Sequence, residues 1–162
     1  MQAHLSELQR DLNAIGFAGE MLVSTVSGGV MHVADVAERP IYMVKSGPAM
    51  APRAGIAYAE AENLSTDLLV VDTGGTTFDV SLVRDGEVKF TRETWLGPLF
   101  YGHNLGLSSV DVRSVGAGGG SLAWIDSGGL LRVGPGSAGA VPGPACYGRG
   151  GTEPTVTDAA VV

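Results

Sequence analysis

The chain has 162 residues, which is enough for one domain with a real hydrophobic core. Its formal net charge is −7 with only 10 lysines and arginines, so we expect neither a nucleic-acid surface nor a patch for anionic membranes. No run of about 18 apolar residues and no charged-then-apolar leader is present, so the sequence predicts a soluble, cytoplasmic chain. A single cysteine, Cys146, excludes an internal disulfide framework.

The first 61 residues alternate helical and strand-like patterns. The predicted elements are a helix over 3–15 closed by Gly16, a core strand over 21–26 followed by a loop, a short helix over 34–38, and a strand over 41–44. An alanine-rich stretch then predicts a helix of about three turns that ends at Ala61. Proline interrupts a helix interior, so we expect Pro52 in its first turn.

The most informative segment is the nonapeptide Asp72–Val80, which follows one apolar run and precedes another. This order predicts a strand, a glycine turn and a second strand. Gly74 and Gly75 lack a Cβ atom, so the backbone can adopt positive φ and bring its N–H groups close to an anion. Thr76 and Thr77 add hydroxyl donors at the same place, and the segment therefore suggests a nucleotide phosphate site.

Two carboxylates, Asp72 and Asp79, flank this turn. Such groups can hold the Mg²⁺ that neutralises a phosphate, usually through water. A Gly-Gly pair between strands is also an ordinary turn signal, in which case the aspartates merely cap the turn. The residues alone leave both interpretations open.

The remainder of the chain is richer in glycine. The predicted features are a tight turn at Asp85-Gly86, a strand over 87–94, an ordered surface loop over 95–107, and a hairpin with strands over 122–125 and 130–133. The strands around the nonapeptide and residues 87–94 form a three-stranded antiparallel meander in a mixed α/β sheet. Residues 135–154 are dominated by Gly, Pro, Ala and Ser and predict irregular backbone held by tertiary contacts or by a ligand.

Further candidates lie outside the nonapeptide. Gly118 and Gly119 belong to a glycine loop that can approach a phosphate closely or simply form a tight connection. Arg113 is a candidate partner for a carboxylate or phosphate, with an exposed salt bridge as the alternative. His103 is a candidate for acid/base chemistry or a solvated hydrogen-bonding residue. For Cys146 we expect a buried structural thiol.

Several motifs occur together in this chain. They are Ser46–Ala49, Asp72–Val80, Gly116–Ser121, Val133–Ala140, Pro142–Gly148 and Glu153–Asp158. In this number and order they resemble the hydantoinase A/oxoprolinase family, a branch of the actin-like ATPase superfamily. Residues 92–95 and 110–116 look most like the ATP-using subunits of acetone and acetophenone carboxylases. Hydantoinase-type members often carry His where Arg113 stands.

The resemblance implies a partial ribonuclease-H-like α/β domain with a mixed sheet and an irregular, glycine-rich C-terminal third. Residues 1–162 would be one domain of a longer subunit. Its expected parts are helix and strand units over 1–64, a phosphate-loop meander over 65–95 and a glycine-rich region over 96–162. A second phosphate loop would be supplied by the remainder of that subunit, so we expect the isolated chain to be inactive or nearly so.

The resemblance also implies an ATP-dependent enzyme that phosphorylates a carbonyl-derived oxygen of a small molecule, together with a hydantoinase B-like partner subunit. The residues expected to bind ATP phosphates are Gly74, Gly75, Thr76, Thr77, Gly118 and Gly119. Asp72 and Asp79 would hold Mg²⁺ through water. Asp79, Arg113 and His103 are the expected catalytic residues. The alternatives are a subunit-interaction module without its own activity, or another actin-like ATPase.

Overall fold

The computed structural model describes residues 2–162 and divides the chain into two compact units. The first unit contains the chain up to Val70 and residues 81–112, and the second contains residues 71–80 and 113–162. The division falls within strands β3 (Leu68–Thr73) and β4 (Phe78–Arg84), so the chain enters the second unit along one strand and returns along the next. The domain expected from the sequence is thus built from two units.

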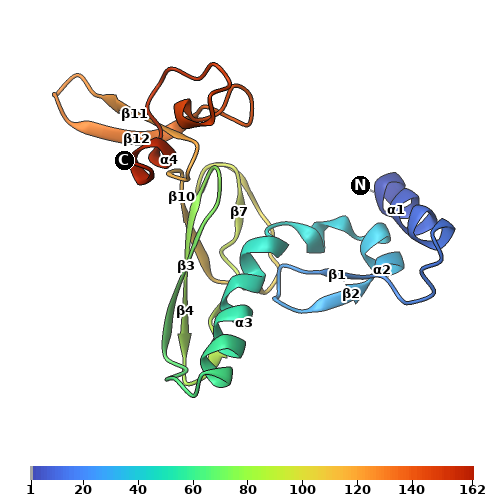
Figure 1. Cartoon of the computed structure of the whole chain (residues 1–162). Helices are drawn as coiled ribbons and strands as arrows, with labels where there is room; N and C mark the ends of the chain where they lie inside the picture. The colour runs from blue at the N-terminus through green and yellow to red at the C-terminus, as the bar shows by residue number, and fades with distance from the viewer. Residues whose placement is uncertain (1) are drawn as a thin grey trace. The chain divides into compact units, whose positions relative to one another are not determined.

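The N-terminal part of the first unit contains two helices and a hairpin (Figure 1). Its elements are α1 (Gln2–Ala14), β1 (Leu22–Ser24), β2 (Val30–His32) and α2 (Val33–Glu38). Leu5, Val33 and Val36 form its buried core. The first helix is present as predicted, but of its predicted apolar residues Leu5 is buried, whereas Leu8 and Ile15 are 40% and 81% exposed. The loop expected after the first strand is instead β2, which pairs antiparallel with β1 through Val23 and Met31.

Two predictions for the next segment were wrong. Residues predicted as a strand over 41–44 form the 3-10 helix η1 (Pro40–Met43), because Pro40 fixes φ in the helical range at its first position. Helix α3 (Ser46–Ala61) starts earlier than predicted and contains Pro52 in its interior. Pro52 is buried on the same helix as Ala49 and Ala59, so packing of this small-residue face offsets the helical hydrogen bond that proline cannot donate.

Four strands form one sheet. Strand β4 lies in its centre, with β3 on one side and β10 (Val112–Val115) on the other, and β5 (Glu87–Val88) also pairs with β4. Because β3 takes one edge of β4, β5 and β10 share the other. The predicted single strand over 87–94 is therefore interrupted, and β6 (Phe90–Thr91) pairs with β9 (Ser109–Val110) instead. Helix α3 packs on β3 at Gly55, where a Cβ atom would lie 2.9 Å from the Val70 side chain (Figure 1).

The segment predicted as an irregular loop over 95–107 contains a short hairpin, formed by β7 (Trp95–Leu96) and β8 (His103–Asn104). The Trp95 and Phe100 rings meet edge to face, with centroids 5.7 Å apart, which anchors the connecting residues. No helix within residues 2–162 has the length and apolar character needed to cross a bilayer.

The second unit is built on the hairpin of β11 (Ser121–Ile125) and β12 (Leu131–Ser137), followed by η2 (Ala145–Tyr147) and α4 (Val156–Ala160). The predicted hairpin is confirmed, with Ile125 paired to Leu131. The Asp126 carboxylate accepts hydrogen bonds from the N–H groups of Gly128 and Leu130.

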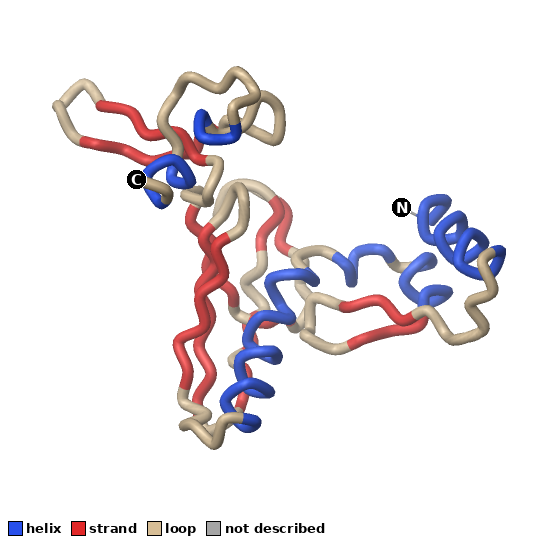
Figure 2. Tube along the Cα trace, viewed as in Figure 1, coloured by secondary structure: helices blue, strands red, loops and turns tan. Residues whose placement is uncertain are grey.

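Figure 2 shows that most of the chain between β12 and α4 is loop, as the composition predicts.

Candidate phosphate-binding site

The glycine turn between β3 and β4 consists of residues 74–77. The Gly74 N–H donates to the Thr77 carbonyl oxygen at 2.9 Å, which closes the turn. Neither Gly74 nor Gly75 has a positive φ, so the turn does not use the left-handed conformation that glycine permits. The absent Cβ matters instead: no heavy atom lies within 4 Å of the place where a Cβ of Gly75 would stand, so the space in front of this residue is open.

The glycine loop over 116–120 binds the carbonyl side of this turn. The N–H of Gly119 donates to the Gly74 carbonyl at 2.9 Å, and that of Gly120 donates to the Gly75 carbonyl at 2.7 Å. The Gly118 N–H donates to the Thr76 carbonyl at 3.2 Å. A Cβ on Gly118 would lie 2.6 Å from the Gly74 carbonyl oxygen, so this contact requires glycine.

These bonds separate the donor and acceptor sides of the turn. The carbonyls are satisfied by the glycine loop, whereas no acceptor among residues 2–162 receives the N–H of Gly75 or Thr76. Two adjacent backbone N–H groups without a partner in a turn are donors of the kind that can bind an anion. The N–H groups of Gly118 and Gly119 are already used by the turn, and their direct contact with phosphate stays a prediction.

A hollow of about 750 Å³ adjoins the turn, within the second unit. Its lining comes from five short segments. They are Thr73–Thr76, Gly119–Gly120, the region from Ser137 to Ala140, the region from Pro144 to Arg149, and α4 with Val161. Sequence reasoning missed Ser137, Tyr147, Arg149 and Thr157, although the composition of residues 135–154 had pointed to backbone held by contacts or a ligand.

The two predicted metal-binding aspartates differ in environment. Asp72 is exposed on β3, whereas Asp79 on β4 is 8% exposed. The Thr77 hydroxyl donates to Asp79 Oδ2 at 3.2 Å, while the buried Oδ1 has no hydrogen-bond partner among residues 2–162. A carboxylate with an unused buried oxygen suits a water of a hydrated cation. Residues 2–162 contain no cluster of three or more His, Cys, Asp or Glu side chains that could hold a metal by themselves.

The remaining predicted residues are not gathered at this turn. Arg113 lies exposed on β10 in the second unit, and His103 lies exposed on β8 in the first unit. Their catalytic roles stay predictions. Gly74, Gly75, Thr76 and Gly119 do line one hollow, a proximity that separation by more than 40 residues hides in the sequence.

Asp158 fixes the wall formed by η2 and α4. Its carboxylate accepts from the N–H and hydroxyl of Thr155, both at 2.8 Å, and caps α4. It also accepts from the N–H groups of Cys146 at 2.7 Å and Ala145 at 3.3 Å. The Cys146 N–H and then the Thr155 hydroxyl, by stabilising the charged form, hold the pKa of Asp158 far below the usual carboxyl range.

The Cys146 thiol was expected to be buried, and this was wrong, because the side chain is exposed. It stands at the surface of η2, where backbone hydrogen bonds to Asp158, and not a packed core, hold the segment. The adjacent Asp158 carboxylate, together with desolvation, raises the pKa of this thiol because a thiolate beside a carboxylate is disfavoured.

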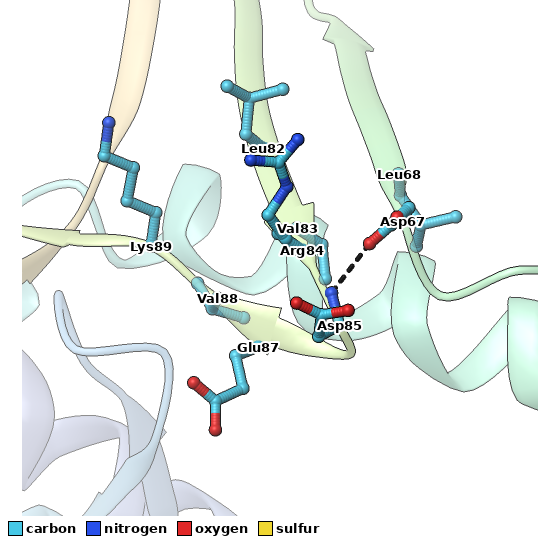
Figure 3. A pocket seen from close by; sticks show the side chains of 9 residues that line it. All are labelled: Asp67, Leu68, Leu82, Val83, Arg84, Asp85, Glu87, Val88 and Lys89. Carbon is cyan, nitrogen blue, oxygen red and sulfur yellow. Dashed lines mark hydrogen bonds between the residues drawn. The ribbon is translucent and has the colours of Figure 1, made fainter.

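A separate hollow of about 690 Å³ lies in the first unit, around the turn between β4 and β5 (Figure 3). The Asp67 carboxylate accepts the Asp85 N–H there at 2.7 Å. Glu87 adds a third acidic side chain, and Arg84 and Lys89 are the basic ones. None of the predicted site residues lines this hollow.

Comparison with known proteins agrees with the sequence motifs. The family model described as hydantoinase/oxoprolinase matches residues 1–162. The caprolactamase alpha subunit of Pseudomonas jessenii is 44% identical over 133 residues, covering 82% of this chain and 18% of its own length. The acetophenone carboxylase gamma subunit of Aromatoleum aromaticum is 40% identical over 163 residues, covering 100% of this chain and 21% of its own length.

Solved structures show the same fold. The crystal structure of the ATP-dependent caprolactamase from Pseudomonas jessenii superposes with a TM-score of 0.72 at 35% identity, over 98% of this chain and 22% of that one. Nucleotide-free acetone carboxylase gives a TM-score of 0.72 at 24% identity, over 97% of this chain and 21% of that one. The chain belongs to the hydantoinase/oxoprolinase family. It spans about a fifth of the length of the caprolactamase alpha subunit and of the acetophenone carboxylase gamma subunit.

Proposed function

We propose that the chain is a phosphate-binding part of an ATP-dependent hydantoinase/oxoprolinase or ketone carboxylase subunit. The observation that carries the proposal is the glycine turn, whose carbonyls are bonded by the glycine loop while the Gly75 and Thr76 N–H groups face no acceptor. The names of the relatives support it, since one solved neighbour is an ATP-dependent caprolactamase and another belongs to ATP-dependent acetone carboxylation.

In this role the turn binds and orients phosphate oxygens. The N–H groups of Gly75 and Thr76 donate to one phosphate, and the Thr76 hydroxyl extends the donor set. The Thr77 hydroxyl, which was also predicted to bind phosphate, would have to exchange its hydrogen bond to Asp79 for one to the ligand. Mg²⁺, when bound, neutralises phosphate charge and orients the phosphates. Asp79, with its unused buried oxygen, and the exposed Asp72 would hold its water ligands. Phosphoryl transfer depends on such positioning more than on covalent chemistry by the protein.

The wider proposal concerns the subunit in which this part works. The acceptor would be a carbonyl-derived oxygen of a small molecule, with Asp79, Arg113 and His103 in the catalytic roles predicted from the sequence. An actin-like arrangement would place a second phosphate loop in the remainder of the subunit, and a hydantoinase B-like subunit would be the partner. We expect this cytoplasmic assembly, and not the 162-residue chain alone, to be active.

A calorimetric titration tests the phosphate site. Mg²⁺-ATP is added to the chain and to Asp72→Asn and Asp79→Asn variants, which keep side-chain shape while removing charge. We expect weak binding that both variants reduce in the presence of Mg²⁺ and change little when the metal is chelated. Equal binding by all three proteins with Mg²⁺ would contradict the assigned metal role, and no binding by the unmodified chain would contradict an autonomous phosphate site.

A second candidate is a subunit-interaction module, favoured by exposed apolar side chains on the second unit. Ile125, Leu131 and Val141 are 63%, 69% and 84% exposed. Such residues are common at interfaces when they are contiguous. A Leu131→Asp substitution that leaves Mg²⁺-ATP binding intact but abolishes capture of a hydantoinase B-like subunit would favour this function. Unchanged capture would count against it.

A further inference from the structure

The hollow of the second unit contains one charged side chain among the described residues that line it, Arg149. No carboxylate lines it, although the whole chain carries a net charge of −7. Arg149 forms no ion pair with any carboxylate among residues 2–162. The cavity next to the glycine turn therefore combines backbone N–H donors with a positive charge that no side chain neutralises.

Local backbone geometry presents Arg149 to the hollow. Gly148 and Gly150 on either side have φ values of +66° and +95°, which side-chain-bearing residues rarely adopt. The guanidinium carbon lies 5.9 Å from the centre of the Tyr147 ring, within the range of a cation–π contact. Tyr147 itself lines the hollow. Arg149 is exposed, and the Tyr147 ring lies beside its guanidinium group.

Hydrogen bonds to Asp158 join η2, which directly precedes the Arg149 segment, to α4. Asp158 accepts the Cys146 N–H from η2 and the Thr155 N–H at the start of α4, so one carboxylate fixes both elements. Both carboxylate oxygens of Asp158 accept hydrogen bonds from this wall, and none of these bonds comes from Arg149. Arg149 lines the same hollow as the glycine turn, and an arginine in that position can bind a phosphate bidentately.

We propose that Arg149 binds a phosphate of a polyphosphate chain whose neighbouring phosphate is held by the Gly75 and Thr76 N–H groups. This inference rests on the proposed function and assigns a ligand-binding role to a residue that the phosphate-loop pattern does not contain. Arg149 supplies charge and two parallel donors, and Tyr147 positions the guanidinium. The ligand class is a di- or triphosphate, supplied as a nucleotide or as inorganic pyrophosphate.

The test is a calorimetric titration of the chain with Mg²⁺-ATP and, separately, with pyrophosphate at low ionic strength. We expect Arg149→Gln to weaken both by roughly tenfold to a hundredfold, as removal of a charged hydrogen-bond donor does, and Arg149→Lys to weaken both by less. Arg10→Gln on α1 removes the same charge from the first unit and serves as the matched control. Tyr147→Leu should reduce affinity without removing charge.

The outcomes separate this inference from the proposed function. Mg²⁺-ATP binding that Arg149→Gln leaves unchanged would overturn the inference and leave the function standing. Pyrophosphate binding that depends on Arg149, without any binding of ATP, would support the anion site and contradict the nucleotide function. Binding of neither ligand by the unmodified chain would overturn both. Thermal unfolding of each variant shows whether a lost affinity reflects a lost fold.

Discussion

The N–H group of Gly119 donates a 2.9 Å hydrogen bond to the carbonyl oxygen of Gly74. This bond joins two glycine motifs that are 45 positions apart in the sequence, and it determines which side of the turn is available. With its carbonyls bonded to the glycine loop, the turn directs only donors outward. The second motif therefore shapes the candidate phosphate site even if it never touches the ligand.

Replacing Gly118 by alanine should destabilise the second unit. The new Cβ would stand 2.5 Å from the Thr76 nitrogen and 2.6 Å from the Gly74 carbonyl oxygen, both backbone atoms that cannot move aside alone. Overpacking of this kind costs about 1–3 kcal/mol. Urea unfolding monitored by tryptophan fluorescence measures the change, and an unaltered midpoint would show that the loop does not press on the turn.

Replacing Gly75 by alanine should leave the stability of the fold unchanged and weaken Mg²⁺-ATP binding. No heavy atom lies within 4 Å of the new Cβ, and φ at this position is not positive, so the fold should tolerate it. The methyl group would occupy open space on the residue that carries one of the two unpaired N–H groups. We expect stability within about 0.5 kcal/mol of the unmodified chain, with Mg²⁺-ATP affinity lowered at least tenfold in calorimetry. Retained affinity would place the phosphate elsewhere.

Asp158→Asn should change how stability depends on pH. The pKa of Asp158 is lowered in the folded chain, so its carboxylate stabilises the fold above the ordinary carboxyl pKa of about 3.9. That contribution is lost as pH falls through the ordinary value towards the folded one. We expect the melting-temperature difference between the unmodified chain and the variant to be constant above about pH 5 and to shrink towards pH 3. A difference that grows on acidification would contradict this linkage.

The same substitution should make Cys146 more reactive. The pKa of the thiol is raised chiefly by the neighbouring Asp158 carboxylate, and only the thiolate is alkylated. In Asp158→Asn the pH profile of iodoacetamide labelling should therefore shift to lower pH. Asp126→Asn, which removes a carboxylate from the β11–β12 hairpin, is the control and should leave the profile unchanged. Identical profiles in all three proteins would show that Asp158 does not act on the thiol.

The features predicted correctly are those whose cause is local in sequence. Asp126 and the glycines after it specify the β11–β12 turn, because one carboxylate accepts two N–H groups within four residues. The nonapeptide predicts strand, turn and strand for the same reason. Pro52 shows where local rules fail, since a buried small-residue face keeps α3 continuous through a residue that would end an isolated helix.

The sequence predicted only those residues of the candidate site that lie together in one segment. Gly75 and Thr76 could be identified because the turn and its donors lie in one segment. Arg149 was missed because its place depends on Asp158, which bonds to η2 from 12 residues away, and no period or spacing signals such a bond. The irregular composition of residues 135–154 indicated that contacts hold this region without indicating which side chain they present.

The most direct test of the central claim is amide NMR of the ¹⁵N-labelled chain during addition of Mg²⁺-ATP. The account predicts the largest shifts at the N–H groups of Gly75 and Thr76, which lack an acceptor, and smaller ones at Gly119 and Gly120, whose bonds to the turn are kept. Shifts confined to the hollow around Asp85 in the first unit, or none under saturating ligand, would contradict a phosphate site at the glycine turn.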